Sequence, residues 1–144
     1  TNDAVSSIAR LIDMGTEAFM VGAAVKGVIS QRLVRRICPE CKTKHLVTAA
    51  EESISKIKQG TEVYVPRGCS VCNHTGYKGR IAIHEVLVLD SELQETIASS
   101  RLTTEELKEE AVKKGMRTLW DNAYDNVIRG NTTVDELLKI AYEQ

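Results

Sequence analysis

Apolar residues recur along the chain first with the period of a helix and then with that of a strand. The first periodic segment predicts a helix, capped by Asn2 or Asp3 and stopped at Gly15, because its apolar residues lie three or four positions apart: Val5, Ile8, Leu11 and Ile12. A second, mostly buried helix is expected over residues 17–26. Residues 28–37 are then typical of a strand, with an imperfect alternation that puts Ile29, Leu33 and Ile37 in phase.

Residues 80–88 predict a second long strand. Ile81 and Ile83 alternate with polar neighbours, and Val86 and Val88 continue the alternation after a phase slip near Glu85. Between the two long strands, the pattern predicts only a short helix and a short strand at residues 63–65. The helix opens with the capping-box pair Thr48 and Glu51 and runs through Ile54 and Ile57 toward Gly60.

The last third of the chain predicts a small helical bundle. Its helix starts are marked by Asp90 or Ser91 and by two capping-box pairs, Thr103 with Glu106 and Thr133 with Glu136, and its stops by Gly115 and Gly130. The apolar residues between these stops are expected on one helical face: Met116, Leu119, Trp120, Ala123 and Val127.

The four cysteines of the chain stand in two C-x-x-C pairs, Cys38 with Cys41 and Cys69 with Cys72. This spacing lets both thiolates of one turn face the same point, so two pairs supply the four soft ligands of a closed tetrahedral site. Such a site suits Zn²⁺ and leaves no position open for water or substrate. We therefore expect a structural zinc site that stabilises a lobe too small to bury much apolar surface.

Redox, disulfide and iron roles are weaker interpretations of the same cysteines. A thioredoxin-like site needs one reactive pair, not two similar pairs in loop-forming sequence. A disulfide framework is typical of secreted chains, and the sequence contains no apolar signal segment. Four thiolates also suit iron, but the spacing does not resemble a ferredoxin run.

Composition narrows the functional classes. The 144-residue chain is 42% hydrophobic with one Trp and one Phe, so its core must be aliphatic. The formal net charge of −1 gives no overall attraction to nucleic acid or membrane. The longest apolar stretch, near Phe19, is too short to span a bilayer. The chain begins at Thr1 without methionine, which we interpret as a piece of a longer protein.

Several short blocks follow one another over nearly the whole chain. They are residues 1–4 (TNDA), 10–15 (RLIDMG), 31–36 (QRLVRR) just before the first cysteine pair, 68–72 with the second pair, 76–80 (GYKGR) and 83–85 (IHE). In this order they resemble the carboxy-terminal part of the type II secretion and type IV pilus assembly ATPases (the GspE/PilB type). The departures are local: Ala82 stands where Gly is usual, and Val5 where Pro is common.

The resemblance implies a hexameric cytoplasmic motor, peripheral at the bacterial inner membrane, that hydrolyses ATP to drive type IV pilus assembly or type II secretion with a platform protein of that membrane. It implies an α/β fold. Residues 1–37 would be the tail of a RecA-like P-loop NTPase core, residues 38–79 an inserted zinc lobe, and residues 80–144 a strand plus a helical subdomain. Neither a nucleic-acid partner nor direct membrane insertion is expected.

Phosphate-binding elements are absent from this sequence. It contains no Gly-x-x-x-x-Gly-Lys-Ser/Thr, so nothing in it can cradle the β- and γ-phosphates or hold Mg²⁺. The resemblance places the phosphate loop, two acidic boxes and a histidine box before Thr1. We therefore expect ATP and Mg²⁺ to bind only in the longer protein, and we assign no catalytic residue to this chain, which should not hydrolyse ATP alone.

Three residues resemble positions close to the nucleotide in that family. Arg80 resembles an arginine whose segment returns to the nucleotide base, and Gln31 and Arg32 resemble the Gln-Arg-Leu element of the core strand. Each also has a simpler interpretation as a solvated residue beside a strand. The three histidines lack an acid partner at a recognisable spacing and are expected to be surface or structural residues: His45, His74 and His84.

Two other classes remain open on the residues alone. A zinc-ribbon nucleic-acid-binding module needs a basic face with interleaved aromatic residues, but aromatic residues make up only 4% of the chain and its last third is acidic. An adaptor stapled by zinc would differ from the motor fragment only in the sequence that precedes Thr1.

Overall fold

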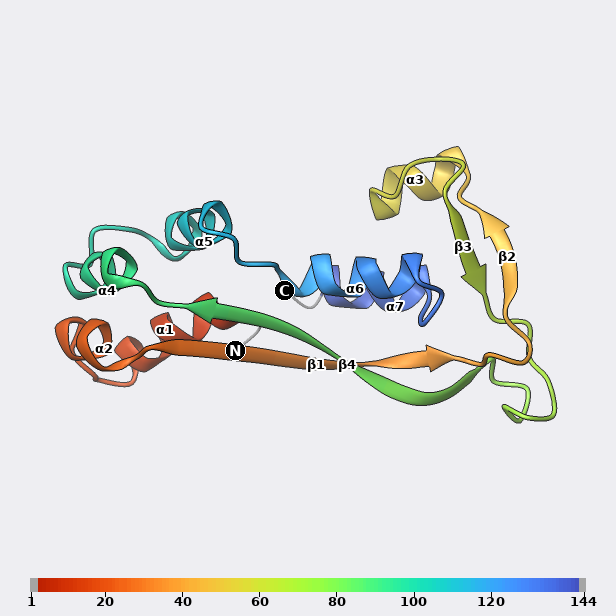
Figure 1. Ribbon diagram of the computed structural model, residues 1–144, viewed down its shortest axis with the longest axis horizontal. Helices are drawn as coiled ribbons and strands as arrows, with labels where there is room; N and C mark the ends of the chain where they lie inside the picture. The colour runs from red at the N-terminus through yellow and green to blue at the C-terminus, as the bar shows by residue number, and fades with distance from the viewer. Residues whose placement is uncertain (1–2, 143–144) are drawn as a thin grey trace. The chain divides into compact units, whose positions relative to one another are not determined.

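The computed structural model describes residues 3–142 of the chain, so the alternative helix cap Asn2 lies outside the described residues. Over this range the fold is a mixed α/β structure (Figure 1). Its elements, in chain order, are α1 (Ala4–Asp13), α2 (Ala18–Ala24), β1 (Gly27–Ile37), β2 (Thr43–Leu46), α3 (Ala49–Ser55), β3 (Glu62–Val65), β4 (Tyr77–Val88), α4 (Ser91–Ala98), α5 (Thr104–Lys113), α6 (Leu119–Ile128) and α7 (Val134–Tyr142).

The strands form two separate two-stranded sheets. The long strands β1 and β4 pair in opposite directions (Figure 1), and the short strands β2 and β3 form an antiparallel hairpin that places Thr43 opposite Val65. The sequence predicted β1, β3 and β4. It did not predict β2, whose residues Thr43–Leu46 are mostly exposed and carry too little apolar alternation to be recognised.

The hydrogen bonds at the two ends of the long sheet indicate a β-bulge in β4. The Leu89 amide donates to the Lys26 carbonyl at 3.0 Å at one end, and the Cys38 amide donates to the Gly76 carbonyl at 2.9 Å at the other. The segment of β4 between these bonds is one residue longer than that of β1. Gly79 has a φ of 77°, the left-handed conformation of a glycine-type bulge, so the extra residue lies there.

The predicted phase slip near Glu85 is therefore wrong. Alternation in β4 continues unbroken through Ile83, Glu85 and Leu87, which all point inward, whereas Val86 and Val88 are 47% and 70% exposed. The prediction followed the apolar residues from Ile83 to Val86, whereas the next inward position after Ile83 is occupied by Glu85. In β1 the expected apolar phase is also wrong, because Ile29 and Leu33 are exposed while Val34 and Ile37 are buried.

Two helix starts explain why Glu85 can be buried completely. One carboxylate oxygen accepts the Ala4 amide of α1 at 3.1 Å, and the other accepts the Leu119 amide of α6 at 3.0 Å. The first amides of a helix have no partner within the helix, and the positive end of the helix dipole favours a negative charge. Glu85 thus supplies one acceptor to each of two helices.

Contacts along the chain divide it into two compact units, and both long strands contribute to each unit. The first unit contains the chain up to Gln31 together with His84–Leu119, and the second contains Arg32–Ile83 and the chain from Trp120 onward. The helices that follow β4 are shared out: α4 and α5 belong to the first unit, and α7 and nearly all of α6 belong to the second.

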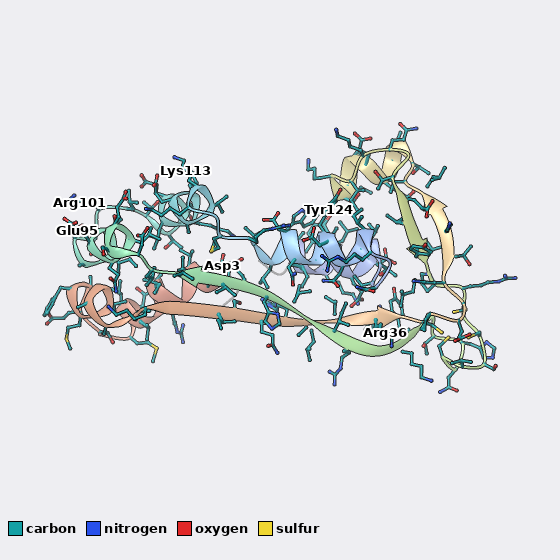
Figure 2. All side chains as sticks on the ribbon, in the orientation of Figure 1. Asp3, Arg36, Glu95, Arg101, Lys113 and Tyr124 are labelled. Carbon is teal, nitrogen blue, oxygen red and sulfur yellow. The ribbon has the colours of Figure 1, made fainter. Side chains whose placement is uncertain are left out.

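The first unit has an aliphatic core between helices and the inner face of β4. α2 packs closely on α4, where a side chain at Gly22 would meet the Gln94 carbonyl at 2.5 Å. Asp3, which is labelled in Figure 2, caps α1 by accepting the Ser6 amide at 2.8 Å and also binds Lys108 of α5 at 3.0 Å. The core residues are Ala4, Val5, Ile8, Val21, Leu87, Leu89, Leu93, Ile97, Leu107, Ala111 and Met116.

Helix signals in the sequence are largely confirmed. Asp90 caps α4, and the capping boxes Thr48–Glu51 and Thr103–Glu106 are both reciprocal. The expected face of α6 is confirmed for Leu119, Ala123 and Val127, which are completely buried, whereas Met116 precedes the helix. α3 is shorter than predicted because Lys56 already takes a left-handed conformation. No helix among residues 3–142 is long and apolar enough to cross a bilayer.

We expect Glu85→Gln to lower the free energy of unfolding by about 1–3 kcal/mol, because the neutral amide offers only one acceptor oxygen and leaves a helix amide unsatisfied. The change is measured by urea unfolding at neutral pH. Glu95→Gln is the matched control, since Glu95 is exposed on α4 (Figure 2) and should change stability by less than about 0.5 kcal/mol. Equal stability of the two variants would contradict the double-cap role of Glu85.

Candidate metal centre

All four cysteines lie in the second unit, at the point where the two long strands end and begin. Cys38 follows β1 directly and opens a turn with Cys41, while Cys69 and Cys72 lie in the loop between β3 and β4. The Cys38 amide is bonded to the Gly76 carbonyl just before β4, so the two cysteine turns start from adjacent stems.

Four sulfur atoms converge on one point in this lobe. They all lie within 4.8 Å of one another, with Sγ–Sγ distances of 3.8 Å for Cys38–Cys69, 3.9 Å for Cys41–Cys72 and 3.7 Å for Cys69–Cys72. A tetrahedron with Zn–S bonds of about 2.3 Å has S–S edges of about 3.8 Å. Disulfide sulfurs would lie about 2.0 Å apart, so these distances fit a four-thiolate metal site and not a disulfide.

Backbone amides already point at two of the sulfurs. The Gly68 amide donates to Cys41 Sγ at 3.3 Å, and Cys72 Sγ accepts the amides of Cys69 and Gly76, both at 3.2 Å. Burial raises the pKa of the Cys72 thiol, but these two amides and the neighbouring sulfurs outweigh it and lower the pKa to about 6. Cys72 therefore loses its proton more readily than an ordinary cysteine and is prepared to act as a ligand.

The partner of Cys72 has the opposite tendency. The Cys72 amide lowers the pKa of Cys69, but burial and the hydrogen bonds with the sulfurs of Cys72 and Cys38 outweigh it and raise the pKa to about 11. Two thiolates 3.7 Å apart repel each other, so the pair readily gives up one proton and holds the second. A bound cation would remove this repulsion, because metal ligation deprotonates a thiol outright.

The rest of the lobe consists of the β2–β3 hairpin and α3, which lie between the two cysteine pairs in the chain. His45 on β2 lies 2.7 Å from the Glu51 carboxylate of α3, and this hydrogen bond is the main reason why the pKa of Glu51 is lowered to about 2. The expectation that His45 has no acid partner is therefore wrong. The pair went unnoticed because Glu51 was assigned only to the capping box, which it also completes.

The turn between α6 and α7 holds the lobe in place within the second unit. The Lys42 amino group donates to the Gly130 carbonyl of this turn at 3.0 Å, and the Ile37 amide donates to the Asn131 carbonyl, also at 3.0 Å. In return, the Thr132 hydroxyl donates to the Arg35 carbonyl at 2.7 Å. The residues on both sides of the first cysteine pair are thus bound by one turn.

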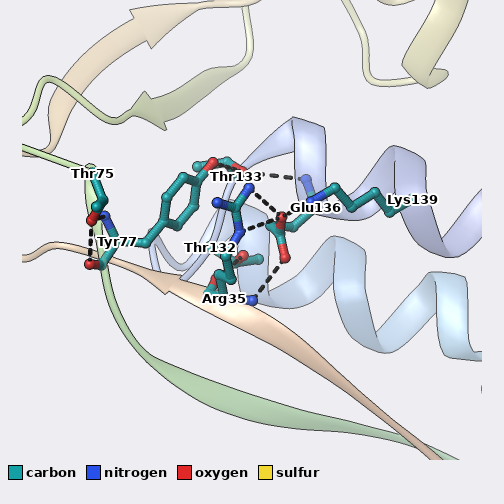
Figure 3. A network of polar contacts seen from close by, with 7 residues as sticks. All are labelled: Arg35, Thr75, Tyr77, Thr132, Thr133, Glu136 and Lys139. Carbon is teal, nitrogen blue, oxygen red and sulfur yellow. Dashed lines mark hydrogen bonds and ion pairs between the residues drawn. The ribbon is translucent and has the colours of Figure 1, made fainter.

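A polar network extends this attachment into α7 (Figure 3). Glu136 accepts the Arg35 amide at 2.8 Å with one oxygen, and its other oxygen lies 2.9 Å from the Arg35 guanidinium and from Lys139. The guanidinium lies 3.9 Å from the centre of the Tyr77 ring, whose hydroxyl meets Thr133 at 2.9 Å. The predicted capping box at α7 is thus half formed: Thr133 accepts the Glu136 amide, but the carboxylate of Glu136 binds Arg35 instead.

The nucleotide-proximal candidates occupy the two long strands. Gln31 is exposed on β1 and its side chain meets His84 of β4 at 3.0 Å, and Arg32 is half-buried in the next position. Arg80 is exposed directly after the Gly79 bulge and borders an open depression with Thr75 and Tyr77. A role of these three residues at a nucleotide stays a prediction.

These features define a mixed α/β protein that carries, between two antiparallel strands, a lobe with four clustered cysteines that could hold a metal ion. Comparison with known proteins places it further. A family model described as type II/IV secretion system protein matches residues 1–139. The chain belongs to this family.

Several relatives of known name match almost the whole chain. It is 44% identical to the type IV pilus assembly ATPase PilB of Thermus thermophilus over 96% of its length, and 38% identical to the type II secretion system ATPase E of Vibrio cholerae over 99%. It is also 38% identical to the type IV pilus assembly ATPase TfpB of Acinetobacter baylyi over 97%. The chain spans only 16%, 28% and 24% of these three relatives, respectively.

We expect Glu136→Gln to destabilise the protein by about 1–2 kcal/mol at pH 7, at the lower end for a buried ion pair because the Arg35 side chain is 46% exposed. Burial raises the pKa of Glu136, but Arg35 and Lys139 outweigh it and hold the pKa below its ordinary value of 4.5. The stabilisation is therefore complete above about pH 4.5 and lost as the pH falls through the folded-state pKa.

Urea unfolding of wild type and variant at pH 7 and at lower pH measures this difference. It should shrink toward zero in acid, where protonated Glu136 resembles glutamine. Glu62→Gln is the control in the same unit, because Glu62 forms only an exposed pair with Lys44 at 3.5 Å. A difference that stays constant with pH would show that Glu136 does not act through its charge.

Proposed function

We propose that this chain is the carboxy-terminal, zinc-containing part of a hexameric ATPase that powers type IV pilus assembly or type II secretion. The observation that carries the proposal is the match to the secretion family and to named ATPases along nearly all of its length. In this proposal residues 1–37 are the tail of the RecA-like core, residues 38–79 the metal lobe, and residues 80–144 a strand with a helical subdomain.

In this proposal, the nucleotide is bound by parts of the longer protein that this sequence does not contain. The sequence contains no phosphate loop, and it corresponds to 16–28% of the relatives' length, so ATP and Mg²⁺ bind residues of the longer protein. Arg80, Gln31 and Arg32 lie near the nucleotide there. The bulge at Gly79 supports this role for Arg80, because bulges commonly redirect a side chain next to an active site.

Zinc is the metal we propose for the four cysteines. The sulfur separations fit the edges of a Zn–thiolate tetrahedron, and four sulfur ligands leave no site for a substrate. Cys38, Cys41, Cys69 and Cys72 would hold the ion. Its contribution is structural: it neutralises the thiolates and keeps both stems of the lobe together, while the residues around them bind the α6–α7 turn.

The partners in this proposal are further copies of the same protein and a platform protein of the bacterial inner membrane. The names of the relatives support the assignment to pilus assembly or secretion machinery. The longer protein would act in the cytoplasm, at the periphery of that membrane and without inserting into it.

The metal is tested by elemental analysis of the purified chain, for which we expect one Zn²⁺ per molecule. Cys69→Ser should lower this content strongly, because three thiolates bind zinc far less tightly than four. Ser70→Ala, at the exposed neighbouring position, is the control and should retain one zinc. A content well below one zinc in the wild type, or no loss in Cys69→Ser, would rule out the zinc site.

The motor function is tested in the longer protein. We expect ATP hydrolysis by the complete protein and none by this chain alone. Cys72→Ser should reduce ATPase activity and assembly output together, because loss of the metal loosens the segment around Arg80 and the α6–α7 turn. Hydrogen exchange reports this loosening directly, with α1 as an internal control that should keep its protection. Unchanged exchange and full activity in Cys72→Ser would overturn the coupling.

A further inference from the structure

Gly76 is hydrogen-bonded to one cysteine of each pair. Its amide donates to Cys72 Sγ at 3.2 Å, and its carbonyl accepts the Cys38 amide at 2.9 Å. It is buried and directly precedes β4. The backbone of this single residue therefore connects the second cysteine turn to the first and connects both to the start of a long strand.

The position also excludes a side chain. Gly76 has a φ of 82°, and a Cβ built on it would lie 2.3 Å from Cβ of Pro66, closer than real Cβ atoms approach one another. Because the obstacle is a proline ring and not the end of a flexible side chain, Pro66 would have to move. Gly68 lies two residues after Pro66 in the chain, and its amide donates to Cys41 Sγ at 3.3 Å. Any movement of Pro66 thus reaches the donor of a third cysteine.

Amides that donate to metal-bound thiolates hold the sulfurs in place and disperse their negative charge. Such outer-shell contacts commonly change metal affinity by about 10- to 100-fold when they are lost. We propose that Gly76 is the positioning residue of the metal centre: it holds Cys72 and Cys38 through its backbone and, by packing against Pro66, fixes the Gly68 amide on Cys41. This inference rests on the proposed zinc site and adds a determinant outside the four ligands.

The test compares Gly76→Ala with Gly60→Ala. Gly60 has a φ of 86°, nearly the same as Gly76, but a Cβ there would meet no atom within 4 Å. Both variants therefore carry the same backbone strain, and only Gly76→Ala pushes against Pro66. Zinc affinity is measured by competition with a chromophoric chelator, and the spectrum of the Co²⁺-loaded protein reports whether the four-sulfur geometry is retained.

We expect Gly76→Ala to bind zinc about 10- to 100-fold more weakly than wild type and to show an altered Co²⁺ spectrum, while Gly60→Ala stays within about threefold of wild type. The double variant Pro66→Gly with Gly76→Ala should recover most of the lost affinity, since the ring that obstructs the new methyl group is gone. It also serves as the folded reference if Gly76→Ala alone proves too unstable to purify.

Equal zinc affinities for Gly76→Ala and Gly60→Ala would overturn the inference, and so would a double variant that is as weak as Gly76→Ala. The failure of the proposed zinc site has a different signature. In that case the wild type itself would bind no zinc, or Cys69→Ser would bind it as well as the wild type does.

Discussion

The convergence of four cysteine sulfurs on one point is the constraint on which the second unit depends. Four thiolates within 4.8 Å of one another repel, so they are stable only around a cation. As neutral thiols, the four sulfurs have little interaction that would hold them together. The lobe around them has little else to stabilise it: one helix of seven residues, a hairpin of four-residue strands, and few buried apolar residues such as Val47, Ile57 and Val63. In the proposed zinc form, the metal therefore takes the place of a hydrophobic core.

The same lobe is attached to the rest of its unit by several polar contacts. The α6–α7 turn binds Lys42, Ile37 and Arg35 through two backbone carbonyls and a hydroxyl. Glu136 adds an ion pair with Arg35 in which the Glu136 side chain is buried and the Arg35 side chain is partly exposed. Directional bonds of this kind specify one arrangement of lobe and helices.

In the first unit, a single buried carboxylate, that of Glu85, connects a strand to two helices. Glu85 is completely buried, and both of its oxygens have partners because two helices begin there. This joins β4 to the start of α1 and to the start of α6. β4 thus begins next to the cysteine lobe, carries Arg80, and reaches both helix starts through the side chain of Glu85.

Local signals in the sequence predicted the caps Thr48 and Thr103 and narrowed two others to Asn2 or Asp3 and to Asp90 or Ser91, of which Asp3 and Asp90 cap their helices. They also predicted most of the buried stripe of α6 and the convergence of the four cysteines. Each of these features depends on residues a few positions apart or on a short, repeated spacing. The fate of Glu85, the partner of Glu136 and the exposure of Ile29 were decided by tertiary structure. A carboxylate is buried only where distant amides meet it, and no periodicity along one strand reports which helix ends will arrive there.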